Sequence, residues 1–258
     1  MTQPFRIRLY QMDAVVGDFD ANLQKIARAA DQARADGISM LVVPELALTG
    51  YPPEDLLLRP ALIDKLDAAN LMLQEISHDV TLCIGAPSAA PVATSDWALG
   101  NNSARPASLL NSLLMYRNGE HVLSYHKQSL PNYQVFDERR YFVAGTQSMV
   151  CDLDGLRVGL LVCEDVWVPD IVESTCRLGV DLILVVNASP FAEGKFGERL
   201  DHLKHRASVN QVPIAYVNLV GGQDELIFDG GSLVVDRDGE IIAQATFFAE
   251  DQLDVVWD

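Results

Sequence analysis

The sequence has no hydrophobic run long enough to cross a membrane, because its longest apolar stretches are about strand length and a spanning helix needs about 20 residues. The first residues, Met1 to Arg6, lack the basic segment, the apolar segment and the cleavage site of a secretory signal. The four cysteines form no CxxC pair and have no partnered histidine motif, so neither a zinc site nor a disulfide framework is expected. These absences predict a cytoplasmic protein with reduced thiols and no bound metal.

Basic residues are scarce. The 258 residues include 19 Lys and Arg against 36 Asp and Glu, which gives a net charge of -17. Such a surface repels polyanions, so nucleic acid and anionic membranes are not expected as partners. With 49% hydrophobic residues the chain can bury a large core, and its length suits one α/β domain over residues 1–258.

Strand and helix patterns alternate along the chain, as in βα units. A helix is expected to open with an Asp cap at Asp20 and to end at Gly37, and residues 89–108 are expected to form a surface loop. Asn118-Gly119 predicts a hairpin turn. The expected strands are Phe5–Met12, a segment from Met40 that ends at Glu45, Thr81–Gly85, Asn111–Arg117, His121–His126, Arg157–Val162, Asp181–Val186, Pro213–Asn218, Leu233–Val235 and Ile241–Ala243, and the further helices are Pro60–Ser77, Pro169–Leu178 and Phe196–Gln211.

Three reactive side chains follow strand-like segments. Cys163 ends an apolar run and precedes a charged turn, Glu45 follows a second apolar run, and Lys127 follows the returning strand of the hairpin. Ligand sites in open α/β sheets form beyond the carboxyl ends of the strands. A thiol, a carboxylate and an amine at that position indicate acyl transfer.

The chemistry assigns each residue a role. A thiol attacks a carbonyl carbon only as thiolate, so Cys163 needs a base, which Glu45 provides. Lys127 and the backbone N–H of Glu164 are the expected donors to the oxyanion. Taken singly, the cysteine is more typical of a small buried hydrophobe, the glutamate of an ion pair and the lysine of the surface. The pattern alone therefore leaves coincidence open.

At these residues the sequence resembles the nitrilase superfamily of carbon-nitrogen hydrolases. The similar segments surround the glutamate (residues 43–51), the lysine (126–127) and the cysteine (162–165), and all three positions carry the residue that the family uses. The resemblance covers nearly the whole chain. It implies a four-layer α-β-β-α sandwich with a Glu45, Lys127 and Cys163 triad.

Within that superfamily the chain is most similar to the N-terminal glutaminase domains of glutamine-dependent NAD synthetases. Three longer segments carry this similarity, at residues 127–142, 187–191 and 217–230. It implies that L-glutamine is hydrolysed through a Cys163 thioester and that the ammonia serves NAD biosynthesis. The residues implied in substrate binding are Tyr133, Glu164 for the α-ammonium group, Trp167 as a wall of the pocket, Ser189 and Lys195.

The synthetase domain of such enzymes, with its SGGxDS-type phosphate loop, has no counterpart in this sequence. No cofactor is therefore expected here, because ATP and Mg²⁺ belong to that missing domain. The chain is an excised domain, a subunit that passes ammonia to a separate synthetase, or a stand-alone amidase acting on another small amide. A non-catalytic partner with a retained fold is a further alternative, and the resemblance implies a homo-oligomer.

Overall fold

The computed structural model describes residues 4–90 and 109–257. It contains two six-stranded sheets, which include all the strands predicted from the sequence. The first sheet has the order β14-β1-β2-β3-β4-β5 and the second has the order β13-β12-β9-β8-β7-β6. A separate hairpin is formed by β10 and β11. The strands of the first sheet are β14 (Asp251–Trp257), β1 (Phe5–Gln11), β2 (Met40–Val42), β3 (Thr81–Ala89), β4 (Leu109–Arg117) and β5 (Glu120–His126). Those of the second sheet and the hairpin are β13 (Ile241–Gln244), β12 (Leu233–Val235), β9 (Ile214–Asn218), β8 (Leu182–Asn187), β7 (Leu156–Val162), β6 (Val150–Leu153), β10 (Val220–Gln223) and β11 (Leu226–Asp229).

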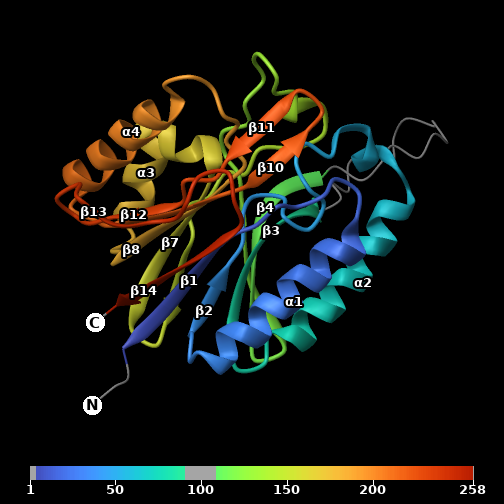
Figure 1. Ribbon diagram of the computed structural model, residues 1–258, viewed down its shortest axis with the longest axis horizontal. Helices are drawn as coiled ribbons and strands as arrows, with labels where there is room; N and C mark the ends of the chain where they lie inside the picture. Colours follow the sequence, from blue (N-terminus) through green and yellow to red (C-terminus); the bar gives the residue numbers. More distant parts are fainter. Residues whose placement is uncertain (1–3, 91–108, 258) are drawn as a thin grey trace, which may run out of the picture.

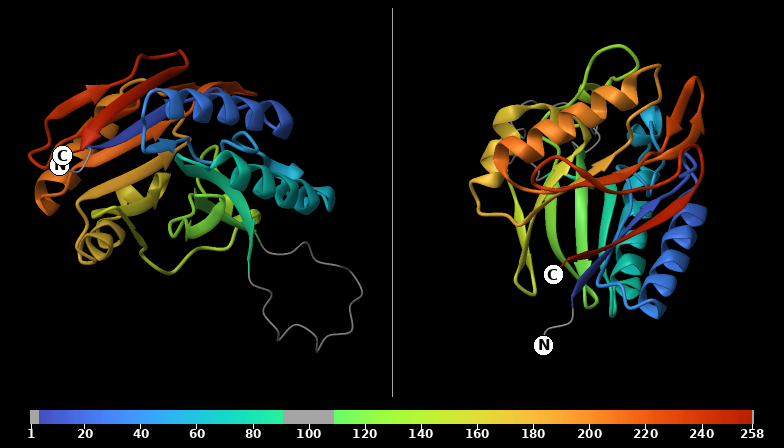
Figure 2. Two further views of the ribbon diagram at one scale, coloured as in Figure 1. Left: turned by 90° about the horizontal axis from the view of Figure 1, so that it is seen from below. Right: turned by 60° about the vertical axis from the view of Figure 1, so that its left-hand side comes forward.

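Two helices cover the outer face of each sheet (Figures 1 and 2). Helices α1 (Phe19–Ala35) and α2 (Ala61–Ile76) pack on the first sheet, and α3 (Pro169–Cys176) and α4 (Lys195–Asn210) pack on the second. The inner faces of the sheets meet where β1 contacts β9 and where β4 and β5 contact β7. This is the four-layer α-β-β-α sandwich that the family resemblance implied, and it contains the βα units that the sequence pattern predicted.

Side-chain alternation along the strands explains why both faces of each sheet are buried. Ile7 and Leu9 of β1 lie in the core between the sheets, whereas Tyr10 lies in the core beneath α1 and α2. In β2, Met40 and Val42 face the second sheet and Leu41 faces the helices. Successive strand residues point to opposite faces, so near-continuous apolar runs suit a sheet that is covered on both sides.

The topology gathers the carboxyl ends of several strands at one edge. Strands β1, β2 and β3 are parallel, and β5 runs the same way because two antiparallel pairings separate it from β3. Strands β7, β8 and β9 are also parallel. Residues that follow β2, β5, β7 and β8 can therefore meet at this edge.

Some boundaries differ from the sequence prediction. The α1 cap is Asp18, whose Oδ1 accepts a hydrogen bond from Ala21 N at 3.1 Å, and not Asp20. Strand β2 ends at Val42, so Glu45 lies in the following turn and not at the strand end. Strands β6, β10, β11 and β14 were not predicted, and residues 91–108 of the expected surface loop lie outside the described part of the chain.

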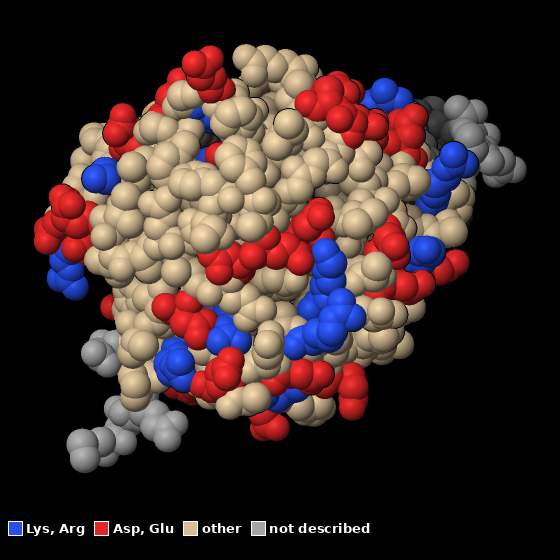
Figure 3. Space-filling view, viewed as in Figure 1, with Lys and Arg blue, Asp and Glu red and all other residues tan. Residues whose placement is uncertain are grey.

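The 36 Asp and Glu residues outnumber the 19 Lys and Arg residues. On the face drawn in Figure 3, Asp and Glu side chains are distributed among Lys and Arg and do not form one patch. No helix within residues 4–90 and 109–257 is long and apolar enough to span a bilayer.

Gly85 of β3 makes room for the turn that carries Glu45. A Cβ at this position would lie 2.2 Å from Pro44 O and 2.6 Å from the Cα of Glu45. These neighbours are backbone atoms, which cannot swing aside as a flexible side chain does. The absence of a side chain at Gly85 therefore fixes how closely the Glu45 turn approaches the sheet.

We predict that Gly85→Ala lowers the free energy of unfolding by roughly 1–3 kcal/mol or more, because an added methyl group overpacks the turn. Urea denaturation measures this change. Gly197→Ala is the matched control, because a Cβ on this exposed residue of α4 meets no atom within 4 Å. That variant gains helix propensity of up to about 1 kcal/mol. A Gly85→Ala protein as stable as the Gly197→Ala protein would contradict the packing argument.

Candidate active site

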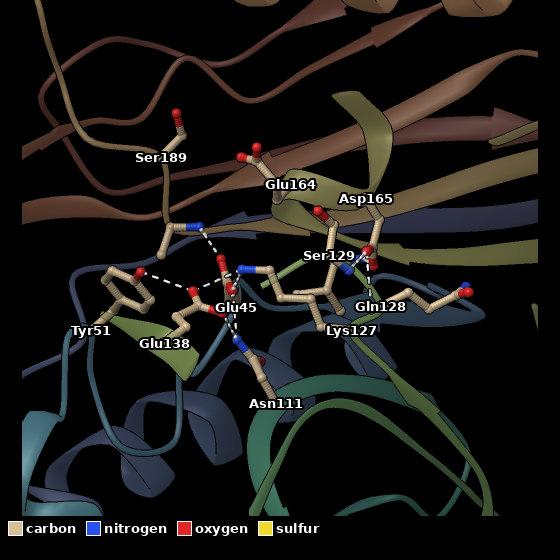
Figure 4. Close-up of polar contacts among 12 residues, drawn as sticks. Glu45, Tyr51, Asn111, Lys127, Gln128, Ser129, Glu138, Glu164, Asp165 and Ser189 are labelled. Carbon is tan, nitrogen blue, oxygen red and sulfur yellow. Dashed lines mark hydrogen bonds and ion pairs between the residues drawn. The ribbon is translucent and has the colours of Figure 1, made fainter. Parts of the chain in front are cut away.

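The centre of the site is a buried ion-pair network around Lys127, which directly follows β5. Its Nζ lies 2.7 Å from Glu45 Oε1 and 2.8 Å from Glu138 Oε1, and all three side chains are at most 5% exposed. Figure 4 shows the ammonium group directed at the two carboxylates. An ammonium group has three protons, so this lysine keeps one donor for a further acceptor.

Glu45 is fixed through both carboxylate oxygens. Its Oε1 accepts from Lys127 and from Asn111 Nδ2, the latter at 2.7 Å, and its Oε2 accepts from the backbone N–H of Ala188 at 2.9 Å. Asn111 belongs to β4 and Ala188 follows β8, so the two sheets hold this carboxylate between them. The orientation of Glu45 therefore depends on both halves of the sandwich.

Glu138 was not among the residues predicted from the sequence. It lies in a short 3₁₀ helix, Glu138–Arg140, and accepts hydrogen bonds from Lys127 and from Tyr51 Oη at 3.0 Å. Burial raises the pKa of Glu138 to about 7, although Lys127 acts in the opposite direction. Burial alone would lower the pKa of Lys127, but the Glu138 and Glu45 carboxylates outweigh it and raise that pKa. Lys127 is therefore an ammonium group at neutral pH.

Cys163 directly follows β7 and opens a short 3₁₀ helix, Cys163–Trp167. Its φ is +47°, in the left-handed region that a residue with a side chain rarely adopts. Such strain is typical of a turn that presents a reactive side chain. Burial raises the pKa of the thiol, and the Glu45 charge adds to this effect while Lys127 opposes it. The thiol is therefore protonated at neutral pH.

Asp165 joins the turn that carries Cys163 to the loop that follows Lys127. Its buried carboxylate accepts from the backbone N–H groups of Ser129 at 2.7 Å, Gln128 at 3.0 Å and Val162 at 3.1 Å, and from Tyr125 Oη at 2.8 Å. Burial raises the pKa of Asp165 to about 6, against the effect of the Ser129 hydrogen bond. This clamp fixes the position of Cys163 relative to Lys127.

Four of the five residues expected to bind substrate contact one another in two pairs, and the fifth lies apart from these pairs. Tyr133 Oη donates to both carboxylate oxygens of Glu164, at 3.1 and 3.0 Å. Lys195 Nζ lies 4.4 Å from the centre of the Trp167 ring. Ser189 is buried beyond the end of β8, with its backbone N–H bonded to Asn218 Oδ1 at 2.8 Å.

The sequence also led to the expectation of reduced thiols at the remaining cysteines and of no metal site. Cys83, Cys151 and Cys176 are free thiols, and Cys83 is buried within β3. Among the described residues, no three His, Cys, Asp or Glu side chains are grouped as a metal site requires.

Comparison with known proteins identifies relatives across nearly the whole chain. The family model for carbon-nitrogen hydrolases matches residues 6–256. The glutamine-dependent NAD(+) synthetase of Aquifex aeolicus is 38% identical over 255 residues, and that of Thermotoga maritima is 40% identical over 254 residues. These matches cover 98% and 97% of this chain but only 42% and 41% of the relatives. The chain therefore spans less than half the length of the synthetases that it matches.

Solved structures also include similar proteins across nearly the whole chain. The glutamine-dependent NAD+ synthetase of Acinetobacter baumannii superposes with a TM-score of 0.91 at 37% identity, covering 99% of this chain and 46% of that one. An amidase from Nesterenkonia superposes with a TM-score of 0.84 at 29% identity, covering 98% and 89%. A glutamate-to-glutamine mutant of that amidase carries the acetamide moiety of fluoroacetamide on its active-site cysteine. The match to the family model over residues 6–256 confirms the resemblance inferred from the sequence, and the chain belongs to the carbon-nitrogen hydrolase family.

Proposed function

We propose that this chain is the glutamine-hydrolysing part of a glutamine-dependent NAD synthetase, and that Cys163 is its nucleophile. The observation that carries the proposal is the buried Lys127 ammonium held between two carboxylates, together with a thiol on a strained turn whose pKa responds to the charges of Glu45 and Lys127. The similarity to synthetases over nearly the full chain supports glutamine as the substrate. The activity needs a nucleophile, a base and an oxyanion site, and this edge of the sheets offers all three.

In the first step, Glu45 takes the Cys163 proton and the sulfur attacks the side-chain carbonyl carbon of glutamine. The carbonyl oxygen becomes an oxyanion, which accepts hydrogen bonds from Lys127 and from the Glu164 backbone N–H. Lys127 suits this role because only two of its three protons are engaged by Glu45 and Glu138. Each preorganised donor of this kind contributes about 3–4 kcal/mol to transition-state stabilisation.

Collapse of the tetrahedral intermediate breaks the carbon-nitrogen bond. The nitrogen takes the proton that Glu45 holds and leaves as ammonia, which produces a thioester on Cys163. Glu45 then takes a proton from water, whose oxygen attacks the thioester, and the carbon-sulfur bond breaks as sulfur regains that proton. Glutamate is the second product. These steps use protein groups and water alone, and ATP and Mg²⁺ would act only on a synthetase domain that receives the ammonia.

The binding residues would recognise the two charged ends of glutamine. Glu164, oriented by Tyr133, would pair with the α-ammonium group. Lys195 and the Ser189 hydroxyl would bind the α-carboxylate, and Trp167 would form a wall of the pocket. The proposal includes a cytoplasmic location and a homo-oligomer, in line with the resemblance.

A second candidate function is that of a stand-alone amidase. The chain covers 89% of the Nesterenkonia amidase with a TM-score of 0.84, which favours this function. Both functions use the same triad, and they differ in whether the charged ends of the substrate are recognised. The binding residues therefore distinguish them.

The test of the main proposal is hydrolysis of L-glutamine by the purified chain. We expect release of glutamate and ammonia, and a loss of roughly 10⁴-fold or more in kcat for Cys163→Ala, because no other group can form the thioester. A glutamine analogue that carries a chloroketone should label Cys163, and mass spectrometry can identify the labelled residue. Cys151→Ala is the matched control and should retain both activity and labelling. Labelling spread over several cysteines, without glutamine turnover, would contradict the proposal and favour a non-catalytic partner.

The pH dependence should report Glu138. Burial raises its pKa to about 7, so its charge is lost as the pH falls through 7, and we expect kcat to fall over the same range, because Lys127 then loses one of the two carboxylates that hold it. Glu138→Gln removes this titrating group, so the acid limb near pH 7 should disappear and kcat should be lowered across the profile. A Glu138→Gln protein whose pH–kcat profile keeps the same acid limb would contradict this assignment.

Glu164→Gln should separate the two candidate functions. A hydrogen bond to a charged group contributes about 1.5–3 kcal/mol, so kcat/KM for glutamine should fall about 10- to 100-fold. The value for a neutral amide of similar length, such as butyramide, should stay unchanged. Glu173→Gln is the control, because Glu173 pairs with Arg177 on α3, where both side chains are exposed. An equal loss for both substrates would contradict recognition of the α-ammonium group.

A further inference from the structure

A buried ion pair, separate from the network around Lys127, connects α4 to the end of β11. Arg199 Nη2 lies 2.7 Å from Asp229 Oδ2, and the two side chains are 1% and 2% exposed. The guanidinium also lies near the rings of Phe196 and Tyr216, with its carbon 5.5 and 5.7 Å from their centres. None of the steps proposed above uses this arginine.

The pair is not built for maximal stability. Within the described part of the chain, Arg199 Nε, Arg199 Nη1 and the Tyr216 hydroxyl are buried and make no hydrogen bond of good geometry, although the Arg199 and Tyr216 side chains lie close enough to affect each other's pKa. Taking an ion pair out of water is unfavourable, and incomplete hydrogen bonding leaves part of that cost without compensation. An incompletely bonded buried arginine therefore points to a role other than stabilising the fold.

Asn218, the last residue of β9, connects the ion pair to the turn after β8. Its Nδ2 lies 3.3 Å from Asp229 Oδ1 and 3.2 Å from the backbone oxygen of Ser189. Its Oδ1 accepts from the Ser189 backbone N–H at 2.8 Å. Asn218 thus binds both backbone groups of Ser189 and fixes the turn from the side opposite to Glu45.

The same turn holds Glu45 on its other side. The N–H of Ala188, the residue before Ser189, donates to Glu45 Oε2 at 2.9 Å. Lys127 and Asn111 both contact the other oxygen, Oε1. The position of Ala188 therefore decides the direction of Oε2. A displacement of about 1 Å from a change outside the reacting groups can cost about 100-fold in rate.

We propose that Arg199 is a positioning residue, which acts through Asp229, Asn218 and the Ala188–Ser189 turn to orient Glu45 as the base. The inference rests on the proposed function in one respect, the role of Glu45 in proton transfer. Arg199 itself touches neither Glu45 nor Cys163 among the contacts described. Its effect is on how Glu45 is held and not on substrate affinity.

The test compares Arg199→Met, which removes the charge at similar volume, with Arg199→Lys, which retains a cation beside Asp229. We expect kcat for glutamine to fall about 10- to 100-fold in Arg199→Met and less in Arg199→Lys, with KM changed by less than about twofold. The matched control is Arg8→Met, because Arg8 is also a buried arginine in an ion pair, with its Nε 2.6 Å from Oδ1 of the more exposed Asp254. That variant should lose thermal stability but keep kcat.

A second readout does not depend on turnover. Hydrogen exchange of the Ala188 amide, followed by NMR or mass spectrometry, should become at least 10-fold faster in Arg199→Met and stay unchanged in Arg8→Met. Alkylation of Cys163 by fluoroacetamide in the Glu45→Gln background should be equally fast with and without Arg199→Met, because Arg199 acts only through Glu45.

The outcomes separate the two proposals. A raised KM with unchanged kcat, unchanged Ala188 exchange, or slower alkylation of the Glu45→Gln protein by the added Arg199→Met change would each overturn the positioning role. Faster Ala188 exchange in a protein that hydrolyses no amide would support the positioning of Glu45 and overturn the proposed function alone.

Discussion

The buried ammonium group of Lys127 is the constraint on which the rest of the site depends. A cation without solvent is tolerated only where opposite charges and hydrogen bonds replace water, so two glutamates must reach it. Glu45 comes from the turn after β2 and Glu138 from the loop after β5, and both lie within 2.8 Å of Lys127 Nζ. The three groups carry one positive and up to two negative charges, and this imbalance is why burial can leave Glu138 partly protonated near pH 7.

Sequence patterns identified the residues of the candidate site that directly follow an apolar strand. Lys127 follows β5 and Cys163 follows β7, and in both places a buried run changes abruptly to polar residues. Glu45 was predicted at the right edge, although β2 ends earlier, because Val43 and Pro44 continue the apolar run. The parallel arrangement of the strands then brings together residues that are far apart in the sequence.

The residues that the sequence did not reveal lack a local signal. Glu138 stands in the run Asp137-Glu138-Arg139-Arg140, which has the composition of a solvated surface segment. Only the tertiary contact with Lys127 makes it a buried group. Arg199 likewise lies in a helix of mixed polarity, and its partner Asp229 is in a strand that periodicity did not predict. Strand β14 was missed because its pairing with β1 joins opposite ends of the chain.

The arrangement of charges divides the site into a buried reacting centre and a more accessible recognition region. The network of Glu45, Lys127 and Glu138 is buried and held by backbone and side-chain donors from both sheets. Glu164 and Lys195 lie on separate elements, one after the nucleophile and one at the first turn of α4, where the helix dipole favours an anion. The α-ammonium and α-carboxylate groups of glutamine would match these opposite charges, so that substrate recognition requires no change in the buried network. In the proposed reaction, the groups that transfer protons are separate from those that recognise the charged ends of the substrate, so substitutions are expected to alter chemistry and specificity separately.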